Sequence, residues 1–498
     1  MIIWEKILEQ FAYIPKEPMI FSSGFFLYLF LGFSLIYCLL KKKDTARILF
    51  VTAFSYYFYY KSSGIYFVLL AIVTLCDFYI AQKIHAIKQE EDDEDGERKA
   101  KYLLFLSLLI DLGLLAYFKY TNFLDEIVCS IISTDPHHWE IFLPVGISFF
   151  TFQSMSYTID VYRGQLKPLD RVLDYAFYVS FFPQLVAGPI VRATDFIPQI
   201  RKPLMVTQEM FGRGVFFILA GLFKKCIISD YIGANFVDRI FDSPELYNGF
   251  ENLFAVYGYC IQIYGDFSGY SDMAIGIALL LGFKFPPNFK APYKAFSIGD
   301  FWRRWHMSLS HWLRDYVYIS LGGGRCSKWR QYMNLFITFF LCGLWHGASF
   351  NFVLFGILQG LAVIGEKALL AWQKRPKHWE PTGFQYWLAV FLNMHFVCMC
   401  WIVFRSQDFA HMQSMVVTIF TNFNIMGIGQ WIAEYWPVAS LIVLGFVLHY
   451  LPTSWNEKAE RIITRMPIYC QALCFLIIVW GIVQVKSADV LPFIYFQF

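Results

Sequence analysis

A histidine, His346, lies in the apolar stretch LCGLWHGASF, and no Asp, Glu, Lys or Arg occurs between residues 331 and 365. An ionisable group in such a segment costs a few kcal/mol to bury in a membrane and by default suggests a functional site. A neutral imidazole can act as a general base or as a hydrogen-bond partner. Gly343 and Gly347 clear volume beside it, as a substrate passage requires. The alternative is a structural histidine whose ring nitrogens form hydrogen bonds to a neighbouring helix.

A second group of residues that could do chemistry lies within the segment SIGDFWRRWHMSLSHWLRDYVYISLGGG, residues 297–324. Tryptophans and tyrosines there alternate with five basic or titratable residues: Arg303, Arg304, His306, His311 and Arg314. Aromatic and arginine side chains suit the headgroup level of a membrane, and arginine also suits phosphates. An interfacial anchoring helix with incidental histidines is the alternative. Two histidines five residues apart do not share one helical face, so they make a poor pair of metal ligands.

Polar residues also interrupt the apolar run 252–281, in the patch IYGDFSGYSDMAIG that contains Asp266, Ser268 and Asp272. A polar kink that helps helices to pack is one interpretation, because small residues allow close approach. Two acids so close together favour the other interpretation, the wall of a hydrophilic cavity. In FFPQLVAGPIVR, residues 181–192, two prolines and a glycine predict a broken helix, whose freed backbone needs protein or a cavity around it.

Several kinds of chemistry have no support in the sequence. Eleven cysteines are scattered without a CxxC pair or a metal-ligand spacing. No nucleotide-binding loop, GxSxG elbow, HExxH or zinc pattern occurs. We therefore expect no metal and no tightly bound cofactor. The net charge of +3 says little about partners, and no feature indicates nucleic acid.

The elements that must position these residues are membrane helices. Hydrophobic residues make up 57% of the chain and charged residues 16%, whereas a soluble protein carries roughly 25% charged residues. Apolar runs near 20 residues recur, and such runs match a hydrocarbon core of about 30 Å. We expect an all-α polytopic membrane protein with about eleven crossings and additional re-entrant or interfacial helices. The long run 335–372 predicts a hairpin or a re-entrant pair.

We expect one membrane domain over residues 1–498. Residues 1–19 suit an interfacial amphipathic helix without a cleavable signal peptide, and residues 411–498 add C-terminal membrane helices. Basic loops mark the cytoplasmic side. KKKDTAR, residues 41–47, is one such loop, and residues 284–330 hold nine Lys or Arg against two acids. On this orientation the C-terminal LPFIYFQF ends on the outer face.

Taken together and in order, five segments resemble the membrane-bound O-acyltransferase (MBOAT) family. They are VGISFFTFQSMSYTIDVYRG, FFPQLVAGPIVR, QIYGDFSGYSDMAIGIALLLGFKFPPNF, FWRRWHMSLSHWLRDYVYISLGG and LWHGASFNFVLFG. Their pattern is most similar to the bacterial alginate O-acetyltransferase (AlgI-like) branch, and more distantly to D-alanyl transfer proteins of Gram-positive bacteria. The similarity covers roughly residues 20–410.

The resemblance implies a ring of tilted helices around a central funnel or tunnel in the bacterial inner membrane. It implies transfer of an acyl group, here acetyl, from a cytoplasmic thioester such as acetyl-CoA to a hydroxyl of an extracytoplasmic polysaccharide. The transfer is either direct or relayed through a periplasmic acyltransferase-like partner protein. The near-invariant histidine of the family falls on His346 and its second histidine on His306.

We expect His346 to be the general base and His306 to assist on the cytoplasmic side. Arginines 303, 304 and 314 are candidates for binding donor phosphates, and Asp266, Asp272 and Ser268 for lining the acceptor path. A polytopic transporter or channel without acyl transfer is the alternative, although no inverted-repeat symmetry supports it. A non-enzymatic scaffold for envelope assembly is a second alternative.

Overall fold

The computed structural model describes residues 9–15, 17–91, 93–376 and 379–485, and all regular secondary structure in these ranges is helical. Six helical stretches there are long and apolar enough to cross a membrane: Asp44–Glu90, Glu94–Ile132, Phe350–Trp372, Gly383–Arg405, Ile428–Tyr450 and Ile468–Val485. The expected all-α membrane protein is therefore confirmed. The eleven crossings, the funnel and the single domain stay predictions. Residues 1–8 and 16 of the predicted helix at 1–19, and all of LPFIYFQF, lie outside the described residues; residues 9–11 are helical.

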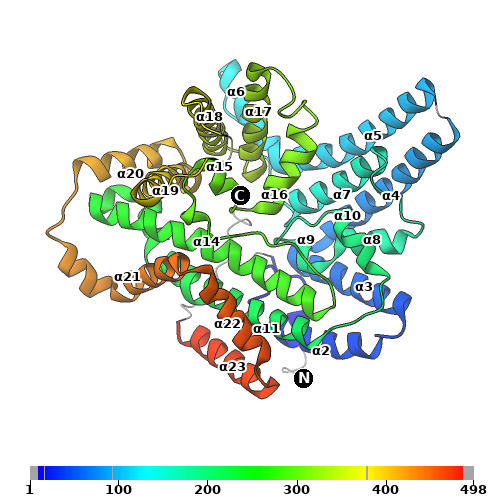
Figure 1. The fold of residues 1–498 in the computed structure, drawn as a ribbon, viewed down its shortest axis with the longest axis horizontal. Helices are drawn as coiled ribbons and strands as arrows, with labels where there is room; N and C mark the ends of the chain where they lie inside the picture. Colours follow the sequence, from blue (N-terminus) through cyan, green and yellow to red (C-terminus); the bar gives the residue numbers. More distant parts are fainter. Residues whose placement is uncertain (1–8, 16, 92, 377–378, 486–498) are drawn as a thin grey trace. The chain divides into compact units, whose positions relative to one another are not determined.

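The chain divides into two compact units, coloured along the sequence in Figure 1. The first contains residues up to Gly214 together with Ala274–Pro286. Its helices are α2 (Gly24–Leu39), α3 (Asp44–Ser63), α4 (Phe67–Glu90), α5 (Glu94–Leu115), α6 (Thr121–Ile132), α7 (Ile147–Tyr162), α8 (Val172–Ser180), α9 (Phe182–Leu185) and α10 (Ala193–Ile200).

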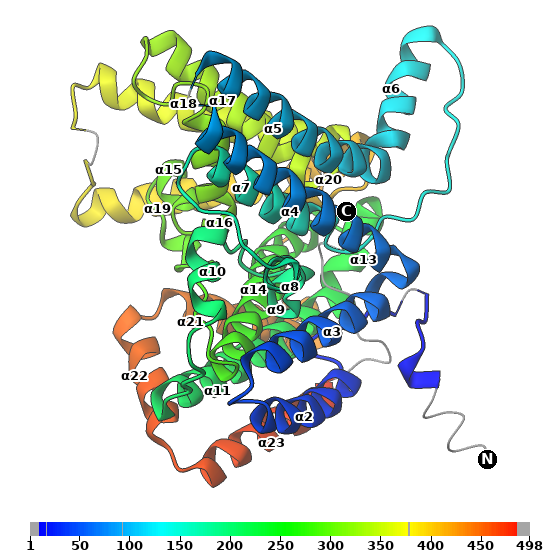
Figure 2. The same ribbon diagram turned by 90° about the vertical axis from the view of Figure 1, so that its right-hand side faces the viewer.

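The helices α4 and α5 form a long antiparallel pair, visible side by side in Figure 2. The acidic run between them starts the second helix. Asp93 caps α5 by accepting a hydrogen bond from the backbone N–H of Gly96, at 2.8 Å. The first turn of α5 then carries Glu94, Asp95 and Glu97, which suit the positive end of the helix dipole.

The core of the first unit is built from phenylalanine. Phe182 meets the rings of Phe33 and Phe54 at centroid distances of 5.6 and 5.0 Å. This ring lies in the segment predicted to break a helix, and the break is confirmed: α8 ends at Ser180, α9 covers one turn, and residues 186–192 are not helical. Residues 181–191 are all buried, so protein encloses the freed backbone.

The second unit contains Val215–Met273 and the described residues from 287 to 485. Its elements are part of α11 (Gln208–Leu222), α12 (Asp230–Ile232), α13 (Asp238–Asp242), most of α14 (Gly249–Leu280), α15 (Ile298–Trp302), α16 (Met307–Trp312), α17 (Lys328–His346), α18 (Phe350–Trp372), α19 (Gly383–Arg405), α20 (Phe409–Thr421), α21 (Ile428–Tyr450), α22 (Thr453–Arg465) and α23 (Ile468–Val485). Two π-helical stretches, Phe223–Ser229 and Gly233–Val237, flank α12.

The helices α17 and α18 form a helical hairpin in the run 335–372, and the predicted alternatives of two crossings or a re-entrant pair both stay predictions, because α18 but not α17 is among the six apolar stretches. Residues 347–349 join them, so His346 is the last residue of α17. The two backbones touch at glycines: a Cβ at Gly343 would lie 2.8 Å from the Cα of Gly356, and a Cβ at Gly356 would lie 2.6 Å from the carbonyl oxygen of Phe339. Any larger residue at these contacts would push the hairpin apart.

In contrast to the hairpin, α14 is one continuous helix of 32 residues. The patch with Asp266 and Asp272 therefore does not break it. Close packing against α11 supports the patch instead, because a Cβ at Gly221 would lie 2.5 Å from the carbonyl oxygen of Gly269.

Candidate active site

His346 lies in the interior of the second unit, with 2% of its surface exposed. Aromatic rings surround the imidazole: Phe404 at 5.3 Å and Phe355 at 5.8 Å between centroids, both in edge-on geometry. Its Nε2 lies 3.9 Å from the Sγ of Cys342, one turn earlier in α17. The histidine therefore faces protein and not the outer surface of the unit.

His306 is fully buried at the residue that precedes α16. Its backbone is left-handed, with φ 41° and ψ 55°, a conformation that costs a residue with a side chain about 1–3 kcal/mol. The turn of residues 303–306 between α15 and α16 imposes this conformation. The imidazole lies edge-on against Phe267, at 4.6 Å between centroids. Backbone strain at a buried histidine is typical of a functional position.

The structure brings the two predicted histidines together. The ring of Trp345 lies 5.6 Å from His306 and 5.1 Å from His346, measured between centroids. Burial and the nearby His346 lower the pKa of His306 well below its ordinary value of 6.5. His306 is consequently a neutral imidazole at physiological pH, available as a hydrogen-bond donor and acceptor.

A buried asparagine that sequence reasoning missed holds this turn. Asn288 has 1% of its surface exposed. Its Oδ1 lies 3.2 Å from the Nδ1 of His306 and accepts hydrogen bonds from the backbone N–H and the hydroxyl of Ser308. Its Nδ2 donates to the hydroxyl of Ser271 at 3.1 Å. The motif KFPPNF contains this asparagine, and an amide after two prolines was the available signal.

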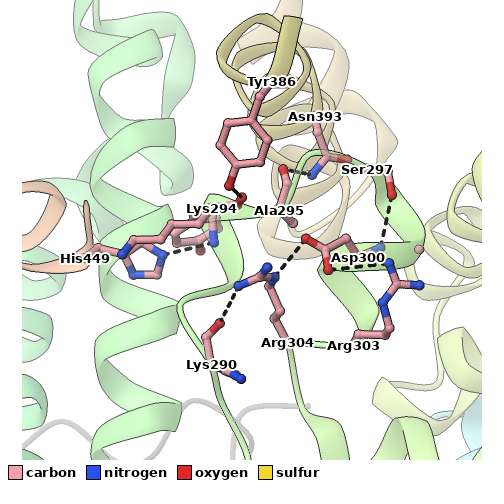
Figure 3. A network of polar contacts seen from close by, with 12 residues as sticks. Lys290, Lys294, Ala295, Ser297, Asp300, Arg303, Arg304, Tyr386, Asn393 and His449 are labelled. Carbon is pink, nitrogen blue, oxygen red and sulfur yellow. Dashed lines mark hydrogen bonds and ion pairs between the residues drawn. The ribbon is translucent and has the colours of Figure 1, made fainter. Parts of the chain in front are cut away.

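The predicted arginines fall into two groups. Arg304 and Arg303 both donate to the carboxylate of Asp300, at 2.8 and 3.5 Å. Arg314 instead pairs with its neighbour Asp315 at 2.6 Å. Figure 3 shows the first group together with Lys290 and Lys294.

Positive charge accumulates in the region of Figure 3. Arg304 also donates to the carbonyl oxygen of Lys290, at 3.5 Å. Burial and the charge of Arg304 lower the pKa of Lys294. Asp300 is the acid labelled in Figure 3, and Glu366 accepts from the N–H of the adjacent Gly299 at 2.8 Å, whereas four side chains of the network are cationic: Lys290, Lys294, Arg303 and Arg304. Such an excess of cations favours an anionic ligand.

The predicted acids of α14 are paired with two lysines that sequence reasoning missed. Asp272 accepts from Lys224 at 2.5 Å. Asp266 accepts from Lys225 at 2.5 Å, and Asp230 binds the same ammonium at 2.6 Å. Both lysines lie in the π-helical stretch Phe223–Ser229. Ser268, on the same helix as the two α14 acids, is buried. Because each of these acids is paired with a lysine, their burial does not require the hydrophilic cavity that the sequence suggested.

Within the part of the chain that the structure describes, no group of three or more His, Cys, Asp or Glu has a geometry that could hold a metal ion. The chemistry available near Trp345 is that of two imidazoles in an aromatic enclosure. Such groups can accept, donate and orient protons.

Comparisons with known proteins identify the family of this chain. The family model of the membrane-bound O-acyltransferases matches residues 55–406. A probable alginate O-acetylase of Pseudomonas putida is 34% identical over 96% of this chain and 100% of its own length. A peptidoglycan O-acetyltransferase of Helicobacter pylori is 34% identical over 81% of this chain and 79% of its own.

A teichoic acid D-alanyltransferase of Bacillus subtilis is 30% identical over 58% of this chain and 76% of its own length. The relatives therefore share acyl transfer but differ, by name, in acyl group and acceptor. The resemblance drawn from the sequence motifs is confirmed. This chain belongs to the membrane-bound O-acyltransferase family and is an O-acyltransferase.

Proposed function

We propose that this protein moves an acetyl group from a cytoplasmic thioester across the bacterial inner membrane to a hydroxyl of an extracytoplasmic polysaccharide, with His346 as the general base. The observation that carries the proposal is that His306 and His346 both pack against the ring of Trp345, inside one buried aromatic enclosure. An enclosure of this kind keeps water away from a thioester and strengthens each hydrogen bond within it.

The proposed reaction needs one proton acceptor. His346 in its neutral form takes the proton of the acceptor hydroxyl while the hydroxyl oxygen attacks the thioester carbonyl. The new C–O bond forms, the C–S bond breaks, and the imidazolium returns its proton to the leaving thiolate. His306 assists from the cytoplasmic side by orienting one of the two substrates.

The cationic network of Figure 3 supports a phosphate-bearing donor such as acetyl-CoA. Arg303 and Arg304 share a single carboxylate, Asp300, so they retain charge for a phosphate. Arg314 is matched one to one by Asp315, and we assign it the weaker part of the predicted donor site.

The acceptor path is proposed to run past Asp266, Asp272 and Ser268 on α14. The names of the relatives specify alginate, peptidoglycan and teichoic acid. We propose a polysaccharide acceptor for this chain, reached either directly or through a periplasmic partner that completes the transfer.

The test uses purified protein in proteoliposomes with radiolabelled acetyl-CoA. We expect His346→Ala to insert normally and to lose acyl transfer and thioester hydrolysis by about 10²-fold or more. His395→Gln is the matched control, because His395 also lies in an apolar helix, α19, where its Nε2 is 2.8 Å from the hydroxyl of Tyr257. Full acetylation by the His346→Ala protein would contradict the proposal.

A further inference from the structure

We propose that Asn288 is a positioning residue that holds His306 in the tautomer with the proton on Nδ1. His306 then offers the lone pair of Nε2 to its substrate. The effect of this tautomer on turnover rests on the proposed function. The tautomer itself rests only on the hydrogen bonds of the turn. Nothing in the family comparison assigns a role to Asn288.

The orientation of the Asn288 amide follows from its neighbours. A backbone N–H can only donate, and the N–H of Ser308 points at one end of the amide at 3.2 Å. That end must therefore be the oxygen, Oδ1. The hydroxyl of Ser308 donates to the same oxygen at 2.9 Å, and the Nδ2 at the other end donates to Ser271 at 3.1 Å. Both ends of the amide are consistent with this single orientation.

The tautomer of His306 follows from the orientation of the amide. Oδ1 of Asn288 accepts but cannot donate, and it lies 3.2 Å from Nδ1 of His306. The hydrogen bond forms only when Nδ1 carries the proton. The hydroxyl of Ser308 also lies 3.4 Å from Nδ1, but its proton goes to the nearer Oδ1, at 2.9 Å, so its oxygen faces Nδ1 as a second acceptor. A neutral imidazole carries a single proton, so Nε2 is left with its lone pair.

The backbone keeps Asn288 in register with the strained turn. The carbonyl oxygen of Asn288 accepts from the N–H of Met307 at 2.9 Å, and the N–H of Lys290 donates to the carbonyl oxygen of Arg304 at 2.9 Å. These two bonds pair residues 288–290 with residues 304–307. The amide therefore reaches the imidazole without the freedom of an independent loop.

The tautomer restricts the substrate group that His306 can orient. A lone pair on Nε2 bonds only to a donor, namely a hydroxyl of the acceptor or an amide N–H of the donor arm. A thioester carbonyl or sulfur accepts and cannot be its partner. His306 is thus assigned to a hydroxyl or an amide N–H, and not to an oxyanion.

The experiment is nitrogen NMR of the full-length protein in lipid, with ¹⁵N-labelled histidine rings and His306→Gln to assign the signal. We expect a neutral ring with protonated Nδ1 in the unaltered protein. Asn288→Leu removes the acceptor, so the proton should move to Nε2 and kcat should fall by roughly 10²-fold with KM for the thioester little changed. Asn288→Asp retains an acceptor and should keep Nδ1 protonated and recover most of the turnover, assayed above the ordinary pH range of histidine.

Ser271→Ala is the matched control, because it removes the partner of Nδ2 and leaves Oδ1 in place. It should keep both the tautomer and most of the turnover. A proton on Nε2 in the unaltered protein, or an unchanged signal in Asn288→Leu, overturns the inference. If Asn288→Leu does not insert, the unaltered protein, Asn288→Asp and Ser271→Ala decide it. The expected tautomer together with full activity of His306→Gln would leave the inference standing and remove His306 from the proposed function.

Discussion

Two buried polar regions of the second unit are built in opposite ways. Beside α14, Asp266 and Asp272 each bind an ammonium, from Lys225 and Lys224. Around Trp345, the two imidazoles are instead enclosed largely by rings. Charges that are matched within the protein hold elements together, whereas a neutral base among apolar walls retains its capacity to take a proton. The contrast separates a region that joins helices, past which the acceptor path is proposed to run, from the region proposed to perform the proton transfer.

The largest effect is expected from removing both imidazoles. His306→Gln and His346→Gln should each lower kcat by about 10²–10⁴-fold. Residues that act as a unit are strongly non-additive, so the double variant should lose little more than the worse single variant. Initial rates of acetyl transfer per inserted protein measure this. Losses that multiply would show two independent sites in place of one reactive region.

Removing one cation from the region beside α14 should lower stability more than turnover. Lys225 has 1% of its surface exposed and serves two carboxylates. Lys225→Met leaves buried acids unmatched, and we expect a loss of about 3–5 kcal/mol of stability. Thermal denaturation and membrane yield measure it, and Lys225→Met with Asp266→Asn should recover part of the loss. Normal stability with abolished transfer would place this region in the chemistry.

A smaller effect is expected where α11 and α14 approach each other. Gly221→Ala would bring a Cβ to 2.5 Å from the carbonyl oxygen of Gly269, and such overpacking costs about 1–3 kcal/mol. Gly32→Ala is the control, because no atom of the described residues lies within 4 Å of its added Cβ. The melting temperature should fall for the first variant and not for the second. Equal melting temperatures would show that the lysine–carboxylate pairs do not depend on this contact.

The smallest effect concerns pH. Burial and His346 lower the pKa of His306 in the folded protein below the unfolded value of 6.5. The unfolded chain therefore binds a proton that the folded protein does not, and stability should fall as pH falls below about 6.5, by about 1.4 kcal/mol per pH unit at most. His306→Gln should lose less stability than the unaltered protein between about pH 7 and pH 5. Parallel melting curves for the two proteins would contradict the assignment.

The sequence predicts the elements that depend on one local signal. His346 in an uncharged run and the broken segment 181–192 both predict local structure that the fold contains. The volume expected beside Gly343 and Gly347 is instead filled by the backbone of Gly356 and the ring of Phe352. Hairpin formation by the run 335–372 follows from its length, since one membrane crossing needs only about 20 residues.

The parts that depend on distant partners could not be predicted. In the sequence, Lys224 and Lys225 stand at the end of an apolar segment, where lysines usually face solvent. In the structure they lie in a π-helical stretch and pair with Asp272 and Asp266 of α14. The left-handed turn at His306 has no glycine to signal it. For Asn288 the sequence offers only an amide after two prolines and does not reveal its role, because the chain must fold before residue 288 meets residues 306–308.

At position 306, stability and the proposed chemistry favour different residues. At φ 41°, glycine would relieve the strain, so drift under selection for stability alone would favour His306→Gly, which deletes the imidazole. Selection for stability does not favour glycine at position 346 in this way, because residue 346 ends a regular helix. Lineages that abandon the reaction should therefore lose the histidine at 306 first, and a glycine there would mark a descendant that no longer transfers acyl groups.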